Sequence, residues 1–224
     1  MAMQLHLLDP PADDRQVFER LAHRQGFRRV AGIDEVGRGP LAGPVVAAVV
    51  VLPSKVDLPT LRDSKQLSAA QREALRHEIL GCACDVSVAS ADASEIDRLN
   101  ILQATFQAML RAIHGLRLTP DFLLIDGPYQ LPIAIPQRGV VKGDQRSLSI
   151  AAASVIAKVH RDQLMGEQHR LYPAYGFQRN KGYGTAEHLQ ALRRHGPCPL
   201  HRLSFRGVLC RDGQEYSAHG HTPG

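Results

Sequence analysis

The sequence predicts an α/β fold in which helices flank a mixed central sheet and further helices follow at the C-terminal end. Strand-like runs come first along the chain, and later strands alternate with helical segments, an order typical of such a layered fold. Residues 45–52 form a near-continuous run of small and branched apolar side chains, as expected for a strand covered on both faces. With 224 residues, 44% of them hydrophobic, the chain suffices for one well-filled core.

The first half of the chain supplies most of the predicted sheet. An acidic start and one apolar face predict a short helix over residues 13–24, which stops at Gly26. A polar helix over residues 68–80 opens with Ser68 as its N-cap. Strands are predicted over residues 28–35, 45–52 and 83–90.

Helices dominate the second half of the chain. Apolar side chains at three- and four-residue steps from Ile96 to Ile113 predict one amphipathic helix, capped by Ser94 and stopped by Gly115. The apolar run that ends at Asp126 predicts a short buried strand. The segments that follow are expected to be a strand at 139–141, a turn at 142–144, a small-residue helix at 147–160, a loop at 172–183, and a helix from the Thr185 cap to just before Gly196.

Positive charge is concentrated in the second half. Between Arg138 and Arg211 there are 13 Lys and Arg against four acids, although the net charge of the whole chain is only +5. A basic part beside an acidic cluster is expected when one region grips phosphates and another holds metal ions. On charge alone, a generally basic soluble protein is the alternative.

Export and membrane insertion are not indicated. The first residues lack an apolar stretch behind a basic start, and no apolar run approaches the ~20 residues of a membrane span. The four cysteines lack metal-ligand spacing, which favours a reducing cytoplasm. We expect a helical extension over residues 1–27, one main domain over 28–211, and a flexible tail over 212–224.

Four carboxylates stand at the ends of apolar runs and beside glycines. Asp34 and Glu35 close the first predicted strand. Asp126 precedes a glycine at the end of another strand, and Asp144 follows a glycine in a turn. Because ligands of open α/β sheets bind outside the carboxyl ends of the strands, we expect these acids to converge. Such oxygen ligands select Mg²⁺ or Mn²⁺ and suffice for two ions that bracket a phosphate, although each acid taken singly would more simply be a strand-end cap or a surface charge.

A glycine-rich turn from Gly37 to Gly43 follows the first two carboxylates. It is not a dinucleotide-binding motif, because its third glycine is one residue late and a strand follows where a helix is required. Glycines let backbone amides approach a sugar-phosphate, and a 2′-hydroxyl both donates and accepts hydrogen bonds. Gly37, Arg38 and Gly39 are therefore candidates for distinguishing RNA from DNA. A plain hairpin turn would explain the glycines but not the arginine.

Several other side chains are candidate substrate contacts. A stripe of hydroxyls and cations lies on one face of the helix after Asp144, which suits a phosphate backbone and equally a solvated face. Its members are Ser147, Ser154, Lys158 and Arg161. Tyr183 stands between two glycines, where a phenol can stack on a sugar or base, although a lone tyrosine is usually structural. The remaining candidates are Ser64, Lys65, Lys142 and Lys181.

Six motifs occur in one order: GIDEVGRGPLAGPVV, DSKQLS, LIDG, VVKGD, SIAAASVIAKVHRD and YGFQRNKGYGT. Together they resemble the bacterial ribonuclease HII family over about residues 28–206. The resemblance implies a ribonuclease H-like fold and hydrolysis of RNA in RNA–DNA hybrids with Mg²⁺ or Mn²⁺. It also implies cleavage 5′ to single ribonucleotides embedded in DNA, which leaves 3′-OH and 5′-phosphate ends and serves ribonucleotide excision repair.

Matched position by position, the resemblance gives roles to individual residues. It implies catalytic, metal-binding carboxylates at Asp34, Glu35, Asp126 and Asp144, a 2′-hydroxyl recognition motif at Gly37, Arg38 and Gly39, and a junction-sensing tyrosine at Tyr183. Asn180 departs from the histidine that is frequent in the family, and we expect altered local contacts there without loss of activity.

The leading hypothesis is a monomeric, metal-dependent endoribonuclease whose partner is an RNA–DNA hybrid or a DNA duplex that contains ribonucleotides. Another ribonuclease H-like nuclease, such as a DNA resolvase, is the enzymatic alternative. A hybrid-binding module whose acids only hold structure is the non-enzymatic alternative, and the complete carboxylate set argues against it.

Overall fold

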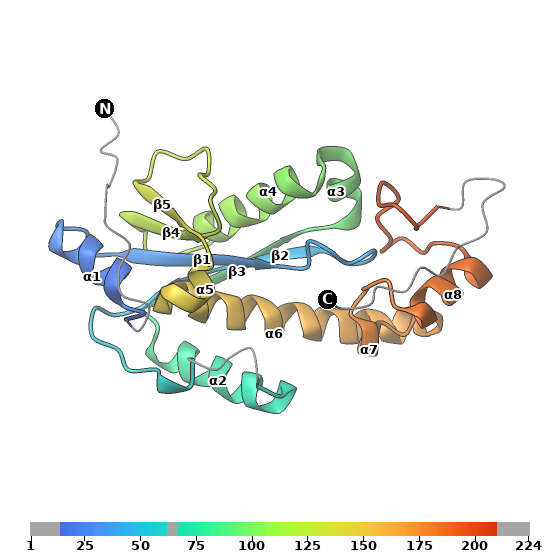
Figure 1. Cartoon of the computed structure of the whole chain (residues 1–224), viewed down its shortest axis with the longest axis horizontal. Helices are drawn as coiled ribbons and strands as arrows, with labels where there is room; N and C mark the ends of the chain where they lie inside the picture. The colour runs from blue at the N-terminus through green and yellow to red at the C-terminus, as the bar shows by residue number, and fades with distance from the viewer. Residues whose placement is uncertain (1–13, 62–66, 210–224) are drawn as a thin grey trace, which may run out of the picture.

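A computed structural model describes residues 14–61 and 67–209 of the chain. Its strands are β1 (Val30–Val36), β2 (Val45–Val51), β3 (Asp85–Ala91), β4 (Phe122–Asp126) and β5 (Gln137–Val140). They form one five-stranded sheet of order β3-β2-β1-β4-β5 (Figure 1). Pairing is antiparallel from β1 to β2 and from β2 to β3, and parallel from β1 to β4 and from β4 to β5. The predicted mixed sheet is confirmed.

Helices cover both faces of this sheet. α3 (Ala93–Leu99) and α4 (Ile101–His114) lie on one face, and α6 (Leu148–Leu171) lies on the other with α2 (Ala69–Cys82) packed against it (Figure 1). Odd-numbered residues of β2 join the core beneath α4, whereas its even-numbered residues join the core beneath α6. This two-sided burial explains why β2 is apolar at all seven positions.

β1 and α6 approach each other closely at Gly32. A Cβ atom at this position would lie 2.1 Å from the backbone carbon of Ser149 and 2.3 Å from the backbone nitrogen of Ile150. A glycine is therefore required for the first turn of α6 to lie against the strand that carries the first two carboxylates.

The chain outside the sheet completes the fold at both ends. α1 (Val17–Arg24) carries Glu19, which accepts hydrogen bonds from the hydroxyls of Ser147 and Ser149 at the start of α6. After α6, a 3₁₀ turn (Pro173–Tyr175), α7 (Phe177–Asn180) and α8 (Ala186–His195) gather around a separate small core. An isolated bridge between Ala42 and His201 joins this C-terminal region to the chain that follows β1.

The single helix predicted over residues 94–115 is wrong in two respects. Asp92, not Ser94, is the N-cap of α3, because its carboxylate accepts the backbone N–H three residues later within a capping box. The helix then breaks at Asn100, whose φ of +71° is left-handed and whose side chain caps the first turn of α4. The break was not predicted because the apolar periodicity continues across it.

Three segments are more helical than predicted. α6 continues beyond residue 160 to Leu171, supported by the ion pair of Lys158 with Asp162 at 2.7 Å. The loop predicted at 172–183 contains the 3₁₀ turn and α7, and the turn at 142–144 opens α5 (Gly143–Arg146). None of the helices in the described ranges is long and apolar enough to cross a membrane. The tail predicted at 212–224 lies outside those ranges.

Candidate active site

Neighbouring strands bring the four predicted carboxylates to one edge of the sheet, here called the carboxylate edge. Asp34 and Glu35 lie near the end of β1, and Asp126 is the last residue of the parallel strand β4. β5 runs parallel to β4 and leads into α5, whose first turn carries Asp144. The backbone N–H of Gly143 donates to Oδ1 of Asp126 over 2.6 Å, which fixes the start of α5 against the end of β4.

The carboxylates of this edge repel one another where water is scarce. Asp34 is only 7% exposed, and its pKa lies well above the ordinary range, first because of burial and then because of the nearby charges of Asp126 and Glu35. Burial also raises the pKa of Asp126; the backbone N–H of Gly143 opposes that rise, and the nearby Asp144 adds to it. A bound cation would relieve both the burial cost and the repulsion.

Glu35 has one oxygen that is paired and one that is not. Oε1 accepts from Nη1 of Arg38 over 3.2 Å, whereas Oε2 is buried with no hydrogen-bond partner among the described residues. Burial raises the pKa of Glu35 even though the charge of Arg38 opposes the rise. A divalent cation fits these oxygens, because it would pair Oε2 and offset the repulsion. Within residues 14–61 and 67–209, no group of three acidic, histidine or cysteine side chains is arranged to hold a metal ion.

The glycine turn, residues 37–43, leaves β1 directly beside the carboxylate edge. Gly37 has a φ of +92°, and a Cβ atom there would lie 2.2 Å from Nε of Arg161, so both conformation and space require glycine. A Cβ atom on Gly39 would lie 3.9 Å from Cε1 of Tyr183. The structure therefore brings Tyr183, whose side chain is exposed, against the same turn.

Arg38 is anchored at the carboxylate edge by a residue that sequence analysis did not identify as functional. Its Nη1 also donates to the hydroxyl of Tyr129 over 3.2 Å, and its guanidinium carbon lies 5.5 Å from the centre of the Tyr129 ring. Tyr129 lies three residues after Asp126, and this proximity to a carboxylate was the one available signal. Glu35 and Tyr129 thus hold the guanidinium of Arg38 at the carboxylate edge.

His188 and His201 form a buried pair behind Tyr183. Their Nε2 atoms lie 3.0 Å apart, and Nδ1 of His188 lies 2.8 Å from the carbonyl oxygen of Tyr183. Nδ1 of His201 accepts the backbone N–H of Cys198 over 2.9 Å. Because a carbonyl only accepts, the contact with Tyr183 places the proton of a neutral His188 on Nδ1. Sequence analysis assigned nothing to these histidines.

This histidine pair should make stability depend on pH. Burial and then the neighbouring His188 lower the pKa of His201 to about 4, against about 6.5 in an unfolded chain. The unfolded chain therefore binds a proton first, so the free energy of unfolding should fall as pH drops from about 6.5 to about 4. Urea denaturation at about pH 7 and about pH 5 measures this change. His201→Gln should weaken the drop and the exposed His195→Gln should keep it; equal pH dependence in wild type and His201→Gln would contradict the assignment.

Two of the candidate lysines bind the same residue, Asp162. Lys158 on α6 pairs with Asp162, and Nζ of Lys181 donates to the backbone carbonyl of Asp162 over 3.2 Å. Burial lowers the pKa of Lys181, and the charge of Lys158 lowers it further. Lys142 is exposed just before α5, and Ser154 is half-buried on α6. Ser64 and Lys65 lie outside the described residues.

Two members of the predicted stripe on α6 do not face solvent. Ser147 is fully buried as the N-cap of α6, where its hydroxyl donates to Glu19 and accepts the backbone N–H of Ile150. Its prediction as a substrate contact is wrong, because the cap uses the hydroxyl internally. Arg161 is also fully buried and donates only to backbone carbonyls of the described residues.

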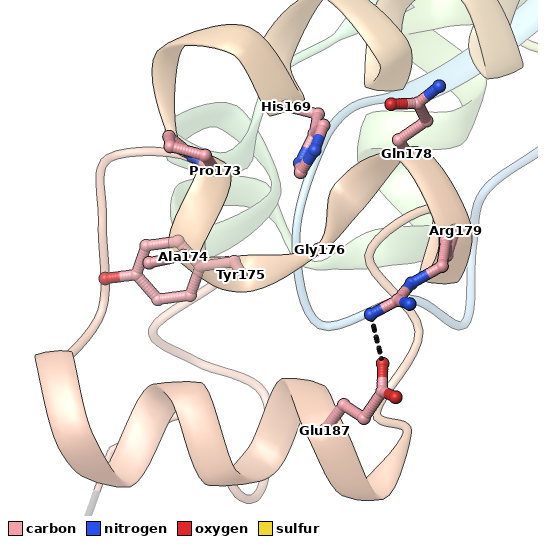
Figure 2. Close-up of a pocket in the computed structure, with 8 residues that line it drawn as sticks. All are labelled: His169, Pro173, Ala174, Tyr175, Gly176, Gln178, Arg179 and Glu187. Atoms are coloured by element: carbon pink, nitrogen blue, oxygen red, sulfur yellow. Dashed lines mark hydrogen bonds and ion pairs between the residues drawn. The ribbon is translucent and has the colours of Figure 1, made fainter.

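One pocket lies in the C-terminal region and not at the carboxylates. It encloses about 450 Å³ beside the 3₁₀ turn and α7, and the ion pair of Arg179 with Glu187, 2.9 Å long, spans part of its lining (Figure 2). None of the four carboxylates lines it.

The fold and the carboxylate edge define a ribonuclease H-like nuclease. The structure is similar to that of ribonuclease H2 from Pyrococcus horikoshii, with a TM-score of 0.70 and 26% identity over 80% of this chain and 95% of that chain. The family model described as Ribonuclease HII matches residues 31–208. The chain belongs to the ribonuclease HII family.

Curated relatives agree with this membership. The chain is 64% identical over 203 residues to a ribonuclease HII of Syntrophobacter fumaroxidans, which covers 91% of this chain and 87% of that protein. It is 56% identical over 191 residues to one of Geobacter metallireducens, covering 85% and 90% respectively. The chain is therefore a hydrolytic endonuclease of a family that acts on RNA–DNA hybrids and depends on divalent metal ions.

Proposed function

We propose that this chain, besides cutting the RNA strand of hybrids, cleaves on the 5′ side of single ribonucleotides embedded in duplex DNA and leaves 3′-OH and 5′-phosphate ends. Asp34, Glu35, Asp126 and Asp144 would hold Mg²⁺ or Mn²⁺. Such ions, when bound, activate water and stabilise the leaving oxygen. The enzyme would work as a monomer in the cytoplasm, with nucleic acid as its partner.

The proposal is carried by one observation, the contiguity of the carboxylate edge with the glycine turn. Glu35 belongs to the edge, and Gly39 belongs to a turn that lies against the Tyr183 ring. A phosphate at the carboxylates thus places its adjoining sugar at the turn, where the backbone N–H groups of Arg38 and Gly39 have no partner among the described residues. A 2′-hydroxyl can pair with such groups, whereas a deoxyribose would leave them without this partner.

The cations around the edge support binding of a long duplex. Lys142 directly precedes α5, and Lys158 and Lys181 both bind Asp162. We propose that these lysines and Ser154 contact phosphates that flank the cleaved one. Such contacts position the duplex without recognising its bases, so affinity should fall steeply with salt.

The decisive experiment is end-mapped cleavage of a duplex that carries one ribonucleotide. We expect one cut 5′ to the ribonucleotide with Mg²⁺ or Mn²⁺, and no cut with a chelator or in an all-DNA duplex of the same sequence. Cutting of the all-DNA duplex would favour a DNA resolvase. Tight binding without any cleavage would favour a hybrid-binding module.

Replacement of Tyr183 should separate catalysis from binding. If its ring stacks on the sugar or base at the DNA–RNA junction, Tyr183→Ala should lower the cleavage rate about tenfold or more, since one stacking contact contributes ~1–3 kcal/mol. Duplex affinity should change less, because many phosphate contacts remain. Single-turnover cleavage and metal-free binding measure the two quantities. Tyr172→Phe, at the end of α6, is the control, and equal losses of rate and affinity in Tyr183→Ala would count against a junction role.

A further inference from the structure

Arg202 is a buried arginine whose guanidinium hydrogen-bonds to backbone carbonyls of the glycine turn. It lies after α8 and is fully buried. Its Nη2 donates to the carbonyl of Gly37 over 2.5 Å, and its Nη1 donates to the carbonyl of Arg38 over 2.8 Å. Nε and Nη2 also donate to the carbonyl of Gly43, over 3.0 and 2.8 Å. One planar guanidinium thus fixes both ends of the turn.

This set of hydrogen bonds determines where the neighbouring N–H groups point. The carbonyl of Gly37 shares a peptide plane with the N–H of Arg38, and the carbonyl of Arg38 shares one with the N–H of Gly39. Both peptides are trans, so each N–H points opposite to its carbonyl and away from Arg202. These are the two N–H groups that lack a partner among the described residues.

The charge of Arg202 has no direct counter-ion within the described ranges. Its hydrogen bonds all go to backbone carbonyls, and Arg161 beside it binds only the carbonyls of Ala42, Pro44 and Lys181. Burial, and then the charge of Arg161, lower the pKa of Arg202 to about 9, so it stays cationic at neutral pH. The guanidinium also lies 5.0 Å from the centre of the Phe205 ring, but a buried cation without a carboxylate partner is costly for stability. Such a cost is expected where the arrangement serves function.

The segment that carries Arg202 is itself tied to the turn. The backbone N–H of Arg202 donates to the carbonyl of Leu41 over 2.9 Å, and the N–H of Gly43 donates to the carbonyl of Leu200 over 2.8 Å. These two backbone hydrogen bonds fix the segment of Arg202 against the turn, so the position of its guanidinium relative to the turn is also fixed.

We propose that Arg202 is a specificity-determining positioning residue: it holds the Gly37 and Arg38 carbonyls inward so that the Arg38 and Gly39 N–H groups are presented to the 2′-hydroxyl and its adjoining phosphate. The inference rests on the proposed function of the same site. It gives the C-terminal region a defined part in discriminating ribose from deoxyribose.

The test measures discrimination and not activity alone. Dissociation constants are determined without divalent metal for a duplex with one ribonucleotide and for the all-DNA duplex of identical sequence. Wild type should prefer the first. Arg202→Gln and Arg202→Lys should each lower this preference about tenfold, as loss of about one charged hydrogen bond implies, while affinity for the all-DNA duplex changes less than about twofold. Lysine keeps the charge but offers a single donor nitrogen in place of the planar guanidinium, whose three nitrogens reach both ends of the turn.

The exposed Arg206, four residues further along, provides the matched control. Arg206→Gln should keep the wild-type preference, which separates positioning from general loss of charge. Circular dichroism and thermal unfolding establish that each variant is folded, and the Lys variant decides the matter if Arg202→Gln does not fold. Equal losses of affinity for both duplexes, or an unchanged preference, would overturn the role of Arg202. Absence of any preference in wild type would overturn the proposed function instead.

Discussion

Asp34→Asn is expected to abolish cleavage and, at the same time, to stabilise the folded protein. Asparagine keeps the shape of the buried side chain but removes a charge that burial and two carboxylates disfavour. Cleavage of a one-ribonucleotide duplex should fall about 10²–10³-fold or more, because the proposed metal site loses one of its carboxylates. The unfolding temperature at neutral pH should rise, by about 2–4 °C for each kcal/mol gained in a chain of this size.

The pH dependence of this stabilisation has a definite sign. The pKa of Asp34 is higher in the folded protein than in the unfolded chain, so wild type loses stability as pH rises through the folded pKa. The gain from Asp34→Asn should therefore be large near pH 7 and small near pH 4.

Divalent cations provide a measurement independent of turnover. Mg²⁺ or Mn²⁺ should raise the unfolding temperature of wild type and should do so less in Asp34→Asn, because ion binding stabilises only the folded state. Asp57→Asn, at an exposed acid outside the carboxylate edge, should change neither cleavage nor the cation response. A cation response of full size in Asp34→Asn would show that Asp34 is not a ligand.

The carboxylate edge was predictable because each of its parts is local in sequence. Short buried strands can be recognised in a sequence as apolar runs. Where such strands are parallel, the acids at their carboxyl ends lie at the same edge of the sheet. β1 with Asp34 and β4 with Asp126 follow this logic. α8 was likewise placed by its Thr185 cap, whose hydroxyl accepts the N–H of His188.

What escaped prediction depends on contacts between distant residues or on one unusual dihedral angle. Arg202 is 165 residues from the glycine whose carbonyl it binds, and no periodicity reports such a contact. The break at Asn100 rests on a left-handed conformation that the apolar pattern does not record. Ser147 was assigned to substrate because spacing alone cannot tell a buried cap from an exposed hydroxyl.

Gly32→Ala is expected to destabilise the protein more than any surface substitution. The added Cβ would lie within 2.5 Å of three backbone atoms of Ser149 and Ile150, and backbone cannot rotate aside as a side chain can. The strand and α6 must separate, so the free energy of unfolding should fall by about 3 kcal/mol or more, the upper range for overpacking in a core. Urea denaturation measures the change through the transition midpoint.

A matched control lies on the same helix. Gly166 is inside α6, and a Cβ atom there meets nothing within 4 Å, so Gly166→Ala should stabilise the protein by about 0.5–1 kcal/mol through helix propensity. If Gly32→Ala lowers the free energy of unfolding and Gly166→Ala raises it, the destabilisation by Gly32→Ala comes from the contact between β1 and α6. Because Gly32 is two residues from Asp34, the fraction of Gly32→Ala that stays folded should also cleave more slowly, as a shift of the strand displaces the carboxylate. Similar stability of the two variants would mean that α6 does not fix the position of β1.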